Sequence, residues 1–174
     1  MINLKKYSFN DYSCMYVRQF YYEKNRLKNI FPDASIEHVG SSSVPGLGGK
    51  GIIDIAIAVS KRDISHAIKT LQHNDYEYRP SSKTQDRWFF QRIIVRSGIE
   101  RRIHIQLTYD NSDSWRSMIA VRDYLRKHRD VAEKYASIKK EAVIRAKGEG
   151  KEYREYKHSF LDRIKKLALK EFSK

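Results

Sequence analysis

The sequence predicts an α+β fold, in which a small mixed sheet with flanking helices is followed by a basic helical half. Two observations predict it. Short β-branched runs bounded by glycine or charged residues fall between residues 36 and 109. Apolar residues recur at helical spacing before and after that region. We therefore expect a core of residues 1–110, and a helical part of residues 111–174 that packs on it as one structural unit.

The first predicted element is a helix. Ser8 offers a capping hydroxyl and Asp11 an acid in the first turn, so the helix is expected to begin there and to end before Pro32. Its apolar positions at helical spacing are Tyr12, Tyr16, Phe20, Leu27 and Phe31. Cys14 is the only cysteine, which excludes an internal disulfide and fits a reducing compartment. We expect it to be a buried helix residue.

The sheet is predicted from four runs. Residues 36–39 and 51–59 form two strands joined by a glycine-serine loop, and residues 64–73 form a connecting helix. Residues 88–95 and 102–109 flank a turn and predict a β-hairpin. In the second arm of this hairpin the odd-numbered residues from Ile103 to Tyr109 face one way, and His104, Gln106 and Thr108 face the other.

The C-terminal part is predicted to be helical and basic. Residues 114–128, 130–147 and 152–172 form three helices, with Gly148 and Gly150 between the last two. The chain carries a net charge of +14, and from residue 115 onward 18 basic residues face 9 acidic ones. Such a surface attracts nucleic acid, nucleotides or acidic lipid headgroups, although a solvated lysine-rich face explains it equally well.

No run approaches the roughly 18 apolar residues that a membrane span requires, and the N-terminal residues lack the apolar stretch of a signal peptide. We expect a cytoplasmic protein without a membrane partner. No Cys/His cluster has zinc spacing, so a structural zinc site is not expected.

The loop between the first two strands has the composition of a phosphate site. Within EHVGSSSVPGLGGKGIIDIAIAV, the glycines let backbone N–H groups approach a phosphate, and Ser41, Ser42 and Ser43 add hydroxyl donors. Lys50 is the only cation of the loop. The spacing differs from that of a Walker A motif, and a plain structural loop remains the alternative.

Asp54 stands among isoleucines in the strand that follows this loop. A carboxylate is costly to bury unless it is paired or bound to a metal. It therefore indicates either a salt bridge to a nearby cation or a ligand for a divalent cation that also holds phosphates.

These segments resemble the GrpB family, whose signature is close to H-[IV]-G-S-[TS]-S-V-P-G-L-x-x-K-P-I-I-D-I. The resemblance continues in WRSMIAVRDYLRKHRDVAEKYASIKKEA and ends in EYREYKHSFL. GrpB proteins are similar to the polymerase-beta-like nucleotidyltransferases. The resemblance implies that Gly40 and Ser41 form the Gly-Ser pair of that superfamily, and that Asp54 is the first of its magnesium-binding acids.

The sequence departs from the superfamily pattern at the other two acids. Ala56 stands where the second acid belongs, and His104 and Gln106 occupy the strand face where the third is expected. One carboxylate is a poor site for two magnesium ions, because magnesium prefers anionic oxygen ligands. Metal-dependent transfer is therefore expected to be weakened or lost.

Cations on apolar helix stripes are candidate anion ligands. Arg122 and Lys157 share the apolar stripes of their helices, and Lys139 lies one step off its own. An internal ion pair is the alternative for each of them. His38 and His104 are expected beside the same cleft, where each is either a hydrogen-bonded structural residue or a base.

Three hypotheses follow. In the first, the protein binds a nucleotide or another phosphorylated small molecule, with Mg²⁺ at Asp54 and with Asp54 and His104 as catalytic residues. The phosphate ligands would be His38, Gly40, Ser41, Ser42, Ser43, Lys50, Arg122, Lys139 and Lys157. The alternative is a non-catalytic nucleic-acid-binding protein that uses the basic helical half. The third is a structural or partner-binding module, which leaves the loop and the acid unexplained.

Overall fold

A computed structural model of the chain describes residues 9–96, 98–146 and 150–172. Its centre is one five-stranded sheet in the order β1-β2-β5-β4-β3. The strands are β1 (Ser35–Val39), β2 (Ile53–Val59), β3 (Glu77–Tyr78), β4 (Trp88–Arg96) and β5 (Ile99–Tyr109). β2 and β5 run parallel and the other neighbours run antiparallel, so the sheet is mixed, as predicted.

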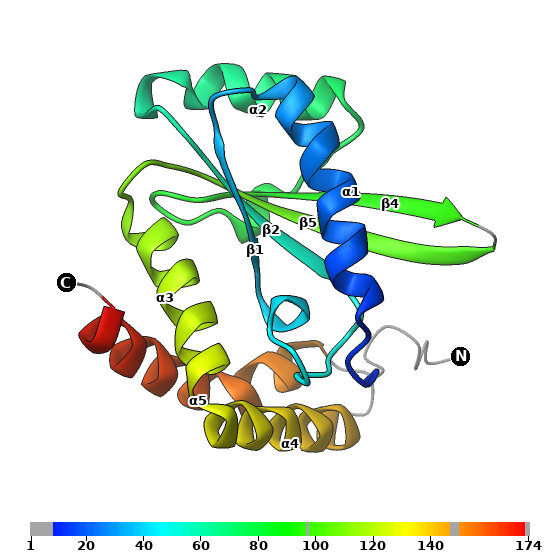
Figure 1. The fold of residues 1–174 in the computed structure, drawn as a ribbon, viewed down its shortest axis with the longest axis vertical. Helices are drawn as coiled ribbons and strands as arrows, with labels where there is room; N and C mark the ends of the chain where they lie inside the picture. The colour runs from blue at the N-terminus through cyan, green and yellow to red at the C-terminus, as the bar shows by residue number, and fades with distance from the viewer. Residues whose placement is uncertain (1–8, 97, 147–149, 173–174) are drawn as a thin grey trace.

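Helices lie on both sides of this sheet (Figure 1), with α2 on one side and α3, α4 and α5 on the other. They are α1 (Met15–Ile30), α2 (Ile64–His73), α3 (Asp113–Lys127), α4 (Arg129–Ala146) and α5 (Gly150–Phe172). The three predicted C-terminal helices are confirmed within a few residues, although Lys147 and Gly148 lie outside the described residues. No helix in the described ranges is long and apolar enough to cross a membrane.

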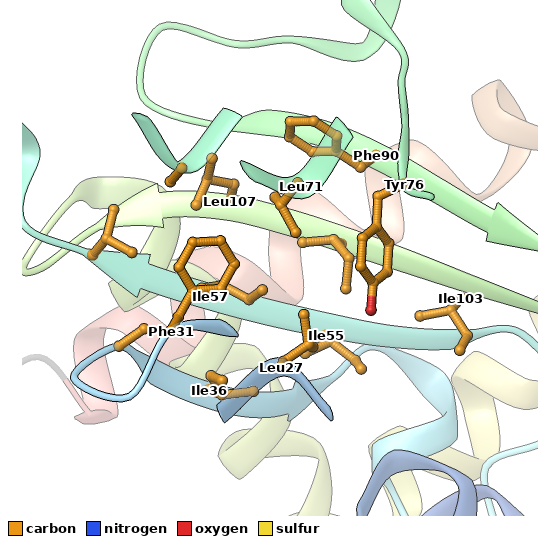
Figure 2. Packing of buried hydrophobic residues seen from close by; sticks show 14 of the residues in the cluster. Leu27, Phe31, Ile36, Ile55, Ile57, Leu71, Tyr76, Phe90, Ile103 and Leu107 are labelled. Atoms are coloured by element: carbon orange, nitrogen blue, oxygen red, sulfur yellow. The ribbon is translucent and has the colours of Figure 1, made fainter. Parts of the chain in front are cut away.

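One sheet face forms the main core with α1 and α2 (Figure 2). Because side chains alternate along a strand, Ile55 and Ile57 of β2 point to the same face, where the parallel register sets them beside Ile105 and Leu107 of β5. All four side chains are fully buried. The core face of β5 therefore carries Ile103, Ile105 and Leu107, with Tyr109 packed at its end, as predicted.

The opposite face carries the polar residues of the same strands. Asp54 lies beside His104 there, and Ala56 beside Gln106. α3, α4 and α5 form a second apolar cluster over this side, and Val44 and Leu47 of the glycine-serine loop pack into it. The loop is thus held between the sheet and the helices.

The predicted start of the first helix is wrong. Ser8 lies outside the described residues, and α1 begins at Met15. The preceding segment is extended, because Asn10 forms two backbone hydrogen bonds with Gly49 of the loop, at 2.6 and 2.8 Å. Cys14 is exposed at the helix start, so its expected burial is also wrong.

Candidate functional site

Two adjoining cavities lie on the polar side of the sheet, beneath α3, α4 and α5. The larger has a volume of about 460 Å³ and the smaller about 200 Å³. Ser41, Asp54 and Lys157 line both cavities. The smaller also brings together Ser42, Lys50, His104 and Lys139. Most of the predicted site residues therefore meet around Asp54.

Asp54 is a partly exposed carboxylate at the start of β2, held between the loop and β5. His104 Nδ1 lies 3.3 Å from Asp54 Oδ1. On the other side Gly40, which has a φ of +69°, packs its backbone against the acid. The glycine-specific backbone conformation of Gly40 brings the loop into contact with the carboxylate.

The loop serines form a single 3₁₀ turn, Ser41–Ser43, and point in different directions. Ser43 Oγ donates to Gly40 O at 2.7 Å, and Ser42 Oγ lies 3.0 Å from His38 Nε2. Arg126, which the sequence did not single out, anchors the turn by donating Nε and Nη2 to Ser43 O. Ser41 remains as the hydroxyl that faces both cavities.

Lys139 is almost completely buried, with 2% of its surface exposed. Its Nζ donates to Ser41 Oγ at 3.0 Å and to Gly48 O, and it lies over the ring of Tyr135. Burial lowers the pKa of Lys139 to about 7; nearby Lys157 adds to this effect and Asp54 opposes it. A small change in its surroundings therefore decides whether this amine is charged at neutral pH.

Two further lysines line the smaller cavity. Lys157 Nζ lies 5.0 Å from the ring centre of Tyr153, and Lys50 Nζ lies 4.2 Å from it. Burial lowers the pKa of Lys157, whereas Asp54 acts in the opposite direction. Three lysines and one carboxylate thus line the same cavity.

Arg122 lines the larger cavity, but its guanidinium group forms ion pairs with two carboxylates. Its Nη1 lies 2.5 Å from Glu37 Oε2, its Nε lies 2.7 Å from Asp123 Oδ1, and Nη1 also donates to His38 O. This is the internal ion pair that the sequence left as the alternative, with Glu37 as the distant partner.

His38 lies on the face of β1 opposite to Asp54, and not on the cleft side. Its ring stacks on Phe20 of α1, with ring centres 4.6 Å apart and an angle of 8° between the planes. Burial lowers the pKa of His38 to about 4, and Asp54 acts in the opposite direction. These contacts give His38 a supporting position beneath the Ser41–Ser43 turn.

The residues around Asp54 do not fit a resident magnesium site. Ala56 occupies the next position on this face of β2, and His104 and Gln106 are the neighbours on β5. Among the described residues, no group of three or more His, Cys, Asp or Glu side chains could hold a metal ion. A single carboxylate among lysines attracts an anion more strongly than a divalent cation.

Arg87 and Ser117 line the larger cavity and were missed by the sequence analysis. Arg87 precedes β4, and Ser117 lies on the cavity-facing side of α3. Arg87 lies outside the quoted family segments, and Ser117 lies within one as an ordinary polar residue, so only the packing of α3 over the sheet reveals their position.

Comparison with known proteins gives a family match over most of the chain. The family model described as GrpB protein matches residues 7–167. UPF0157 protein YqkA of Bacillus subtilis (strain 168) is 33% identical over 122 residues. That alignment covers 68% of this chain and 34% of YqkA, so the match spans about a third of that relative.

Two solved structures have the same fold. The conserved protein GrpB from Enterococcus faecalis superposes with a TM-score of 0.80 and 27% identity, over 96% of this chain and 100% of that chain. The Cid1 poly(U) polymerase, in its Mg 3'-dATP-bound form, gives a TM-score of 0.50 at 14% identity, over 72% of this chain and 41% of that chain. At that identity the likeness concerns the fold alone, which is nucleotidyltransferase-like.

Proposed function

The chain belongs to the GrpB protein family, and we propose that it binds a nucleotide or another phosphorylated small molecule in the cleft beside Asp54. One observation carries this function: Ser41, Lys139 and Lys157 line the smaller cavity together with Asp54, and Ser41 and Lys157 also line the larger one. Lysine ammonium groups and a serine hydroxyl are suitable donors to phosphate oxygens.

Burial strengthens this arrangement. Desolvation lowers the pKa values of both Lys139 and Lys157, so their ammonium groups are poorly solvated in the empty protein. A phosphate would replace part of the missing solvation and favour the charged amines. The nucleotidyltransferase-like fold supports the same choice of ligand, because a Cid1 structure with that fold was solved with Mg 3'-dATP bound.

Nucleotidyl transfer is proposed to be weakened or lost. A two-ion mechanism needs anionic ligands beyond Asp54, and Ala56 and Gln106 supply none. In whatever transfer remains, we assign His104 as the group that accepts the proton of an acceptor hydroxyl. Asp54 would orient its ring through the 3.3 Å contact at Nδ1.

Calorimetric titration with nucleoside triphosphates and inorganic tripolyphosphate tests the binding function. It should be run once with EDTA and once with Mg²⁺. We expect binding to persist in EDTA, and Lys157→Ala to weaken it about tenfold, as expected for the loss of one charge-assisted contact. Lys166→Ala removes the same charge from an exposed position of α5 and should leave the affinity unchanged.

Absence of binding to every phosphorylated compound would contradict this function. A higher affinity for unstructured RNA, falling steeply with salt and unaffected by Lys157→Ala, would instead support nucleic-acid binding by the basic helices.

A further inference from the structure

The larger of the two cavities combines apolar walls with a lining of charged residues. The walls come from α3 and α5, and their apolar side chains are Met118, Val121, Leu125 and Leu161. The part that it shares with the smaller cavity, here called the loop end, is lined by Ser41, Asp54 and Lys157. A ligand with an anionic group at that end would place its remaining atoms between the two helices.

Three residues that line this cavity carry a buried polar atom without a hydrogen-bond partner in the described part of the chain. These atoms are Gln106 Oε1 on β5, Arg87 Nε before β4 and Ser117 Oγ on α3. An unsatisfied buried polar group costs about 1–3 kcal/mol. Native proteins leave few such groups, and a ligand or an ordered water commonly completes them.

The chemistry of these atoms is complementary to a planar heterocycle. Gln106 Oε1 accepts a hydrogen bond, Arg87 Nε donates one, and the Ser117 hydroxyl can do either. Apolar walls suit the faces of an aromatic ring, whereas mixed donors and acceptors suit its edge.

Building on the proposed function, we propose that this cavity is a nucleobase-binding subsite. The base lies between α3 and α5, where Gln106, Arg87 and Ser117 contact its polar edge. The phosphates of the same nucleotide lie at Ser41 and Lys157. The ligand is then a nucleotide, and other phosphorylated small molecules bind more weakly.

A third cavity, of about 680 Å³, lies near the N-terminal segment but does not share these features. It is lined mainly by loop and hairpin residues, among them Asn10, Glu100 and Arg101. None of the unpartnered polar atoms among the described residues belongs to its lining. The other two unpartnered atoms, Gln19 Oε1 and Glu23 Oε2, line a separate cavity of about 400 Å³ beside α1. The cavity between α3 and α5 is the one that joins such atoms to Ser41, Asp54 and Lys157.

Titration with matched anions tests the subsite. The full chain in EDTA is titrated with ATP, GTP, CTP and UTP, and with inorganic tripolyphosphate, which has the anionic chain but no base. We expect at least one nucleotide to bind tenfold or more tightly than tripolyphosphate. Gln106→Leu and Ser117→Ala should each remove several-fold of that difference and leave tripolyphosphate binding unchanged.

The stability of the empty variants separates a ligand contact from a structural one. If the unpartnered polar atoms bind a ligand and no protein group, Gln106→Leu unfolds at the same denaturant concentration as the wild type or at a higher one. A loss of stability without any change in base preference would overturn the subsite. Equal affinity for tripolyphosphate and all four nucleotides would also overturn it, while leaving phosphate binding intact. Failure of every anion to bind would overturn the proposed function together with the subsite.

Discussion

A Cβ atom at Gly40 would lie 2.6 Å from Oδ2 of Asp54. The loop backbone therefore touches the carboxylate directly, with no room for a side chain between them. Gly40 also has a φ of +69° and a ψ of −169°, a combination that is essentially restricted to glycine. This contact fixes the Ser41–Ser43 turn relative to β2, and with it the hydroxyl of Ser41.

Gly40→Ala should therefore damage both stability and binding. We expect a loss of roughly 1–3 kcal/mol in the free energy of unfolding from backbone strain, with an additional loss from the clash with Asp54. Tripolyphosphate affinity should fall as the turn shifts. Urea unfolding and calorimetric titration measure the two effects.

Gly46→Ala is the matched control for this change. Gly46 also has a positive φ, +79°, but a Cβ there has no described heavy atom within 4 Å. The Gly46→Ala variant should lose only the unfolding free energy that backbone strain costs, and its affinity for tripolyphosphate should be unchanged. Equal behaviour of the two variants would mean that the Gly40–Asp54 contact is not needed to position the loop.

His38 makes stability sensitive to acid. Its folded pKa is lowered from 6.5 to about 4, mainly by burial against Phe20. Below pH 6.5 the unfolded chain binds a proton that the folded chain resists, so stability falls as the pH drops from 6.5 towards 4. The full contribution is about 3 kcal/mol, at 1.36 kcal/mol for each pKa unit.

His38→Gln keeps a side chain that can bond Ser42 and removes the titration. The unfolding free energy of the wild type minus that of the variant should decrease steadily as the pH falls from 6.5 to 4. A constant difference over this range would show that His38 does not resist protonation. Comparing the two proteins cancels the titration of the carboxylates that they share.

Much of the site could be read from the sequence because its signals are local. Alternation along residues 102–109 predicts that His104 and Gln106 leave the core face, and this is confirmed. The glycine-serine loop and Asp54 are adjacent in sequence, so their proximity follows from a short connection. The resemblance of their pattern to the GrpB family is confirmed by the family match.

What the sequence missed depends on contacts between distant segments. Asn10 pairs with Gly49 instead of starting a helix, and no local pattern encodes that bridge. Arg122 meets Glu37 across 85 positions, so spacing could not identify its partner. Lys139 lies off the apolar stripe of its helix, yet it is buried because Ser41 and a loop carbonyl accept its hydrogen bonds.

Anion affinity should fall as the pH rises through about 7, because Lys139 loses its proton in that range. Sulfate is a suitable probe, since its own charge is constant from pH 5 to pH 9. The wild type should bind sulfate more weakly at pH 8.5 than at pH 6, and Lys139→Met should bind it weakly with little dependence on pH in this range. Chemical shifts of the site residues during titration report both affinities.

The same lysine gives stability the opposite dependence on pH. Its folded pKa lies below the unfolded value of 10.5, so between about pH 7 and pH 10 the unfolded chain binds more protons. Stability in the absence of anions therefore rises with pH over this range. Lys139→Met should remove that rise, and an unchanged slope would mean that the amine is not desolvated.

Asp54→Asn distinguishes a phosphate site from a magnesium site. The carboxylate stands among Lys139, Lys157 and His104, where its charge opposes an incoming anion. Asp54 also raises the pKa of Lys139, so the comparison is made at pH 6, where this amine is charged in the wild type. In EDTA at that pH, we expect the variant to bind tripolyphosphate about tenfold more tightly, as the loss of a unit charge about 10 Å away would produce at an effective dielectric constant near 20. Asp162→Asn removes the same charge from an exposed position of the larger cavity and should change the affinity less. If Asp54 were instead a magnesium ligand, wild-type nucleotide binding would require Mg²⁺, and Asp54→Asn would weaken it by replacing the anionic ligand of the ion with a neutral amide.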